Sequence, residues 1–203
     1  TLDDIINNQR GGLLSIGFIL ALYFSTNGMS SLIQAFNSSY HIRENESIIK
    51  HQLLSILLTV VISALVFLTI ILIIFGKTTI TYLVDFQLIN QNKIVFLNIA
   101  KWIVLIFMLF IGITTIFNIG PAIKSKIKIF SPGAILATLF IILTSIVFSY
   151  YIDNFSQYNK IYGSIGTLII ILLWIYFNAI FLLIGFELNA SILNAKKNLT
   201  NKL

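Results

Sequence analysis

Five uncharged apolar runs dominate this chain, and each is close to the length that a helix needs to cross a lipid bilayer. A helix rises about 1.5 Å per residue, so a hydrocarbon core of about 30 Å requires roughly 20 residues. The predicted spans are residues 12–36, 53–75, 102–119, 133–152 and 165–186. Because the runs lack the alternating strands of about ten residues that build transmembrane barrels, they predict an all-α fold. We expect one polytopic transmembrane helical bundle over residues 1–203.

The composition supports a membrane environment and excludes several kinds of chemistry. Only 10% of the 203 residues are charged and 58% are hydrophobic, whereas soluble domains carry about 25% charged residues. The chain has no cysteine, which excludes disulfides and thiolate metal sites. Two histidines lie in the charged segment HIRENESIIKH (41–51), but their spacing matches no metal motif. We therefore predict no catalytic residue, no metal and no cofactor.

The distribution of basic residues predicts how the chain is oriented. The segments 37–52, 120–130 and 187–203 lie on one side of the membrane and hold eight of the 13 Lys and Arg residues. An excess of Lys and Arg marks the cytoplasmic side, so we expect a cytoplasmic C-terminus. Thr1 then lies on the opposite side, and this favours a sixth span before it. The outer segment 76–100 fits equally well an interfacial amphipathic helix or a plain loop.

Polar side chains inside the spans are the candidates for a functional site. In the first span, Tyr23, Asn27, Ser30 and Gln34 form a polar stripe, while Gly17, Ala21, Ser25 and Gly28 form a separate ridge of small residues. On the last span, one helix face carries Trp174, Asn178, Gly185 and Asn189. The stripe, with Trp174 and Asn178, could line a polar cavity. It could also hold helices together by hydrogen bonds, and both interpretations stay open.

Glu187 is the one acidic residue close to the last span. The apolar run before it is long enough to cross the membrane alone, which places Glu187 near the cytoplasmic end. Arg43 and the basic run KSKIK (124–128) are predicted on the same side. We therefore expect Glu187, Asn189 and Arg43 to form a cytoplasmic latch, in which Glu187 accepts a basic partner or the donors of a helix terminus.

Two stretches resemble the YihY/BrkB family of bacterial inner-membrane proteins. They are YNKIYGSIGTLIIILLWIYFNAIFLLIGFELNA (158–190) and SPGA (131–134); GGLLSIG (11–17), Asn37 and Tyr40 also fit. The resemblance implies an integral inner-membrane protein with one further span before this region. Family members have been linked to virulence and to lipid or lipopolysaccharide export, and some were mislabelled ribonuclease BN. Where members often carry an arginine, this chain has the neutral Thr26 and Asn27.

These observations favour a transporter or flippase-like protein for an amphipathic or lipid-linked substrate. The alternative is a membrane scaffold without a substrate path. The expected partners are membrane lipids, a lipid-linked substrate and, for either function, further copies of the chain as a homo-oligomer. Neither nucleic acid as a partner nor ribonuclease activity is expected, because the sequence offers no set of carboxylates and histidines that could hold two metal ions about 4 Å apart.

Overall fold

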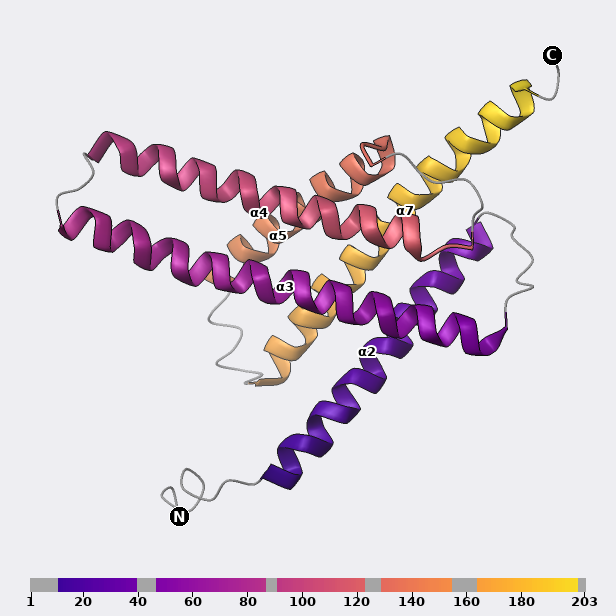
Figure 1. Ribbon diagram of the computed structural model, residues 1–203, viewed down its shortest axis with the longest axis horizontal. Coiled ribbons are helices and arrows are strands. Elements are labelled where there is room, and N and C mark those ends of the chain that lie inside the picture. Colours follow the sequence, from indigo (N-terminus) through magenta and orange to yellow (C-terminus); the bar gives the residue numbers. More distant parts are fainter. Residues whose placement is uncertain (1–10, 40–46, 87–90, 123–128, 155–163, 201–203) are drawn as a thin grey trace.

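The computed structural model describes residues 11–39, 47–86, 91–122, 129–154 and 164–200. These residues form five α-helices joined by short connections, and no strand occurs among them. The helices are α2 (Gly11–Ser39), α3 (Ile48–Asp85), α4 (Gln91–Ile119), α5 (Pro132–Asn154) and α7 (Ser164–Thr200), shown in Figure 1. Each is long and apolar enough to cross a membrane. The predicted all-α, five-span architecture is confirmed.

The segment 76–100 differs from both structures expected for it. It is neither an interfacial helix nor a plain loop, because α3 continues to Asp85 and α4 already begins at Gln91. No proline follows Gly76 to end the helix, and the Thr78 hydroxyl donates a hydrogen bond to the Ile74 carbonyl. The aliphatic part of Lys101 packs across Gly76, so the two extended ends lie side by side as a helical hairpin.

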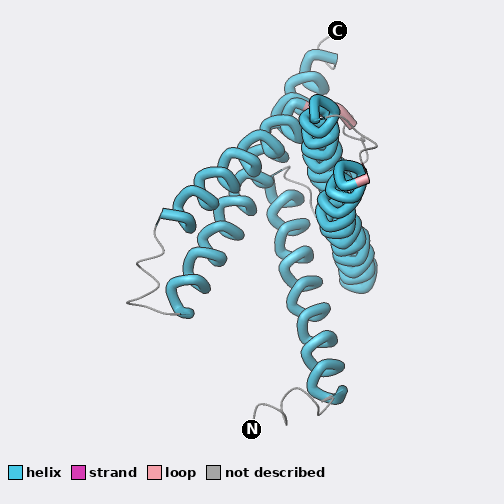
Figure 2. Tube along the Cα trace, turned by 90° about the vertical axis from the view of Figure 1, so that its left-hand side faces the viewer, coloured by secondary structure: helices cyan, strands magenta, loops and turns pink. Residues whose placement is uncertain are grey.

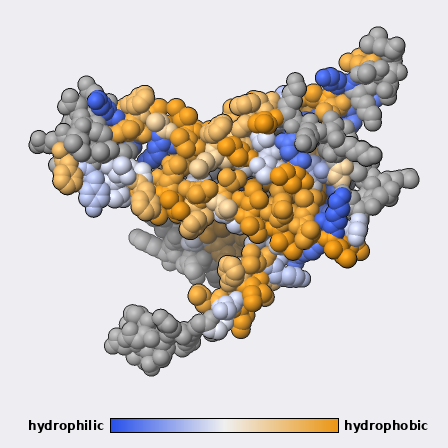
Figure 3. All heavy atoms as spheres, viewed as in Figure 1, coloured by the Kyte–Doolittle hydropathy of each residue, from blue (hydrophilic) through white to orange (hydrophobic). Residues whose placement is uncertain are grey.

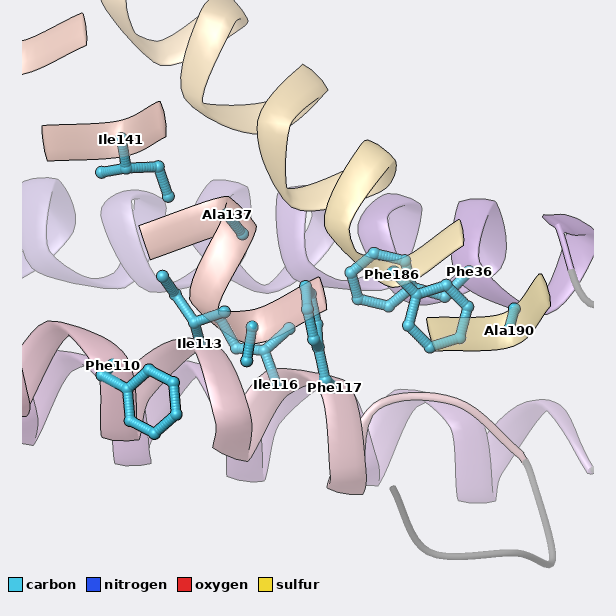
Figure 4. Packing of buried hydrophobic residues seen from close by; sticks show 10 residues of the cluster. Phe36, Phe110, Ile113, Ile116, Phe117, Ala137, Ile141, Phe186 and Ala190 are labelled. Atoms are coloured by element: carbon cyan, nitrogen blue, oxygen red, sulfur yellow. The ribbon is translucent and has the colours of Figure 1, made fainter. Parts of the chain in front are cut away.

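The hydrophobic core lies where the C-terminal parts of α2, α4 and α7 meet the N-terminal part of α5, and we call this region the packed end. Its buried side chains come from α2, α4, α5 and α7 (Figure 4): Phe36, Phe110, Ile113, Ile116, Phe117, Ala134, Ala137, Ile141, Phe186 and Ala190. Phe36 stacks on Phe186 with ring centroids 4.3 Å apart, and Phe117 meets both rings edge-on. Leu58 and Ser55 of α3 are also fully buried, so α3 joins this region near its start.

Away from the packed end the helices diverge. Figure 2 shows three arms: the α5–α7 pair, α2 alone and the α3–α4 pair. Large apolar side chains are exposed along these arms, among them Phe18 and Phe24 of α2, Phe67 and Ile74 of α3, and Leu168 and Leu172 of α7. Apolar residues also cover most of the described surface seen in Figure 3. Such a surface suits lipid acyl chains and not water.

The backbones of α5 and α7 approach each other closely at two glycines. A Cβ added to Gly133 would overlap the carbonyl oxygen of Gly185, and one added to Gly185 would lie 2.8 Å from the Ala137 Cβ. Small residues permit this contact, which is how membrane helices gain packing energy without a hydrophobic driving force. By contrast, a Cβ at Gly17 or Gly28 would meet nothing within 4 Å. The predicted ridge of small residues on α2 is thus exposed in the described structure.

Alanine substitutions at Gly133 and Gly28 should have different effects on stability, because one glycine lies in a tight contact and the other on an exposed ridge. Gly133→Ala places a methyl group against a backbone oxygen that cannot rotate away, and overpacking of this kind costs about 3 kcal/mol. Gly28→Ala is the matched control, because its methyl group points into open space, and we expect a change within about 0.5 kcal/mol. The free energy of unfolding in detergent micelles measures both. Equal stability of the two variants would contradict the α5–α7 contact.

Candidate functional site

Asn189 joins α7 to the first turn of α5 through both ends of its side-chain amide. Its Oδ1 accepts a hydrogen bond from the Gly133 backbone N–H at 2.8 Å, and its Nδ2 donates to the Ser131 hydroxyl at 2.9 Å. Asn189 and Ser131 are both buried. Ser131 caps the helix that begins at Pro132, since Ser131 Oγ also accepts from the Ala134 N–H at 3.3 Å. Two backbone donors that a helix start leaves unpaired are thereby satisfied.

A second buried asparagine makes a similar connection at the end of α2. Asn37 is 3% exposed, and its Oδ1 accepts a hydrogen bond from the Ala122 N–H at 2.9 Å. Ala122 follows the Gly120-Pro121 turn that ends α4. The two asparagines therefore tie α7 to α5 and α2 to the end of α4, both by accepting from a backbone N–H. We call Asn37 and Asn189 the two asparagine ties.

Of the three residues predicted to form the latch, Glu187 and Asn189 are described, and only Asn189 is buried. The Glu187 side chain is exposed, and no described residue gives it a hydrogen bond or an ion pair. Arg43 and residues 124–128 lie outside the described part of the chain. The helix-terminal donors expected for Glu187 instead bind Asn189, two residues further along. An ion pair between Glu187 and a basic residue stays a prediction.

The polar stripe of the first span meets α3 only in part. Ser30 Oγ lies 2.9 Å from His51 Nε2, and Gln34 Nε2 is 3.5 Å from the same hydroxyl. Tyr23, however, is 58% exposed, and Asn27 is half-buried. The stripe therefore supplies one hydrogen-bonded contact to α3, and most of its remaining length faces outward.

The polar face of the last span is directed toward α5. Trp174 Nε1 donates a hydrogen bond to Ser145 Oγ at 3.3 Å, and Asn178 Nδ2 donates to the Trp174 carbonyl at 2.7 Å. No hydrogen bond joins this group to Tyr23, Asn27, Ser30 or Gln34 in the described structure. The six residues predicted to line one polar cavity are therefore not brought together: Ser30 bonds to α3, and Trp174 bonds to α5. Tyr23 and Gln34 are exposed.

The chemistry that these side chains offer is hydrogen bonding. Among the described residues, no three His, Asp or Glu side chains gather where they could hold a metal ion. The polar groups that do meet are amides, hydroxyls, one indole and one imidazole. Sequence reasoning did not foresee Ser145 or His51 as partners, because no spacing rule connects residues that lie 29 or 21 positions apart.

A multi-pass helical membrane protein is the class that this fold and these polar contacts define. The chain belongs to the BrkB family: the family model described as "Virulence factor BrkB" matches residues 1–202. The "Putative ribonuclease-like protein YfkH" of Bacillus subtilis is 33% identical over 192 residues, which cover 95% of this chain and 70% of that protein.

Shorter similarities connect the chain to membrane proteins named UPF0761. One from Pseudoalteromonas translucida is 35% identical over 82 residues, covering 40% of this chain and 27% of the relative. One from Haemophilus influenzae is 36% identical over 96 residues, covering 47% of this chain and 35% of the relative. No solved structure is significantly similar to this chain.

Two parts of the predicted family signature meet in the structure. SPGA (131–134) starts α5, and Asn189 of the GFELNA stretch (185–190) binds that start. Gly133 and Gly185, one from each stretch, lie in close contact through their backbones. Residues 158–163 of the signature lie outside the described residues. The described parts of the signature therefore have a common structural task, which is to lock α5 against α7.

Asn189→Ala should destabilise the fold far more than Glu187→Gln. The alanine variant leaves the buried Gly133 N–H without its acceptor, which costs about 2 kcal/mol. Glu187 is exposed, and an exposed ion pair contributes less than about 1 kcal/mol. Denaturant titration of purified protein in micelles compares the two variants. If Glu187→Gln proved the more damaging change, the tie would have to be reassigned from Asn189 to Glu187.

Proposed function

We propose that this protein moves amphipathic or lipid-linked molecules across the bacterial inner membrane, with its C-terminus in the cytoplasm. The observation that carries the proposal is the contrast between the two ends of the described helices. At one end, the core and the two asparagine ties hold four segments together. At the other end, the arms separate (Figure 2). Apolar side chains are exposed along them.

Diverging arms suit a substrate that has a polar head and an apolar tail. The tail can stay among the lipid chains, because the apolar side chains along the arms are exposed. The head, by contrast, needs hydrogen-bonding groups inside the membrane, since an unpaired polar group in hydrocarbon costs several kcal/mol. Ser145, Trp174 and Asn178 supply such groups on the α5–α7 arm.

The outer part of α7 adds an apolar surface to the same arm. Thr167, Leu168, Ile171 and Leu172 line an open surface of this helix. Three of these four side chains are aliphatic, so the surface suits an acyl or isoprenoid chain better than a polar molecule. It lies on the same helix as Trp174 and Asn178, about two turns closer to the diverging end. A molecule with its tail on this surface could therefore present its head to the polar pair.

Ribonuclease activity stays outside the proposal, although the word appears in the name of the YfkH relative. Many nucleases hold two metal ions about 4 Å apart with carboxylates and histidines. The described residues bring no such group together. Homogeneous protein that cut RNA, and lost that activity on His41→Ala, would favour an enzyme instead.

Lipid movement can be tested directly in reconstituted vesicles. We expect wild-type protein to speed the exchange of fluorescent phosphatidylglycerol between leaflets, measured by chemical quenching of the outer leaflet. The double variant Ser145→Ala/Asn178→Leu should slow this exchange about tenfold, because a barrier higher by 1.4 kcal/mol has that effect. Phe24→Leu, on an exposed part of α2, is the matched control and should not change the rate.

A wild-type protein that left the exchange rate at that of empty vesicles would count against lipid movement. Equal rates for the double variant and the control would leave lipid movement standing but remove the polar pair from its path. Both variants must first show wild-type helix content and unfolding behaviour, so that a loss of rate reports on the path.

The scaffold function keeps one specific observation in its favour. Gly17 and Gly28 lie on an exposed ridge of small residues, and small residues are what membrane helices use to approach one another. A scaffold would place another helix on this ridge, supplied by a second copy or a different protein. Gly17→Ile/Gly28→Ile should then change the mass of the assembly measured in micelles. Unchanged mass together with unchanged lipid exchange would leave the ridge facing lipid.

A further inference from the structure

One buried polar atom of the described structure has no hydrogen-bond partner. Asn178 donates from Nδ2 to the Trp174 carbonyl at 2.7 Å, yet its Oδ1 is buried and accepts from no group in the described structure. A buried acceptor without a donor costs about 1–3 kcal/mol, so its retention calls for a physical reason.

The depth of Asn178 makes this cost more significant. Eleven residues separate it from Asn189 at the packed end, which is about 16 Å along a helix. In a hydrocarbon core of about 30 Å, Asn178 therefore lies near the middle. At this depth lipid supplies no donor, and the partner has to come from the protein or from a polar molecule that enters.

The hydroxyls of Thr144 and Ser145, in the stretch of α5 that meets Trp174, are already engaged. The Ser145 hydroxyl donates to the Ile141 carbonyl at 2.8 Å, and its oxygen accepts from Trp174. The Thr144 hydroxyl donates to the Phe140 carbonyl, also at 2.8 Å. Each of these hydroxyls would have to give up a bond within α5 in order to reach Asn178. Neither hydroxyl donates to Asn178 Oδ1 in the described structure, so this acceptor is open to a donor from a molecule that enters the seam.

Aromatic rings border the same seam between α5 and α7. Phe140 meets Phe181 with ring centroids 4.9 Å apart, and Phe148 meets Phe177 at 6.1 Å. The Trp174–Ser145 hydrogen bond, at 3.3 Å, is long for an N–H donor, and Trp174 is 39% exposed. The seam is thus closed at Gly133 and Gly185 by backbone contact, but farther out it depends on ring contacts and one long hydrogen bond.

We propose that Asn178 is a water-binding site in the middle of the membrane, reached along the α5–α7 seam from the diverging end. Water donates one hydrogen to Asn178 Oδ1 and the other to the remaining lone pair of Ser145 Oγ, which gives it the two polar partners that a buried water needs at minimum. The inference deepens the proposed function and rests on it in one respect: the same hydrated position would receive the polar head of a transported molecule.

The absence of cysteine from the chain makes the proposal accessible to thiol labelling. Asn178→Cys and Ser145→Cys place a thiol on either side of the seam. Tyr176→Cys is the control, since Tyr176 lies at the same depth of α7 and is 60% exposed. A charged methanethiosulfonate reagent reacts with the thiolate, which forms only where water reaches, so the seam thiols should react at least about tenfold faster than the control.

The measurement uses full-length protein in phosphatidylcholine vesicles, with Ser38→Cys at the exposed end of α2 as the reference for a fully accessible thiol. Ser145→Cys changes one atom, so it keeps the test valid if Asn178→Cys fails to fold. Seam thiols that react no faster than Tyr176→Cys, beside a rapidly labelled Ser38→Cys, would overturn the proposal. Rapid seam labelling without lipid exchange would sustain the water site and count against the proposed function instead.

Discussion

The contact between Gly133 and Gly185 is the constraint on which the rest of the structure depends. Two helix backbones come so close that neither position has room for a side chain. This approach brings Asn189 within hydrogen-bond reach of the first turn of α5. It also places Phe186 beside Phe36 and Phe117, so the aromatic core follows from the same crossing. In a membrane, where burial of apolar surface gives no driving force, packing and hydrogen bonds of this kind have to hold the fold together.

The polar groups at the packed end have more of their hydrogen-bond partners than those farther along the contact of α5 with α7. At the packed end, both asparagine ties receive a backbone N–H, and Ser131 completes the start of α5. Farther along α7, Asn178 keeps an acceptor that no described group fills. A rigid, fully bonded end and a less satisfied seam are the combination that a protein needs if its arms are to move while the fold persists. This difference is the physical basis of the proposed function.

Much of the architecture could be predicted from the sequence, because uncharged runs report membrane helices directly. The start of α5 at Ser131-Pro132 was also predictable, because a serine N-cap followed by proline at the first helical position is a local sequence signal. The partners of Asn189 and Ser30 were not, because contacts between distant helices depend on crossing geometry that no local pattern encodes. The sequence marked Glu187 as the residue of interest through its charge. The structure gives the corresponding helix-terminal contact to its neutral neighbour Asn189.

The central claim is that the helices are fixed at one end and diverge at the other. Because the chain has no cysteine, spin labels can be attached to introduced cysteine pairs. The distances between the labels can then be measured in vesicles by electron paramagnetic resonance. A pair at the packed end, Ser38→Cys with Ile192→Cys, should give one narrow distance distribution. A pair on the diverging arms, Phe18→Cys with Leu168→Cys, should give a longer and broader one. Two equally narrow distributions with similar mean distances would show a closed parallel bundle and contradict the account.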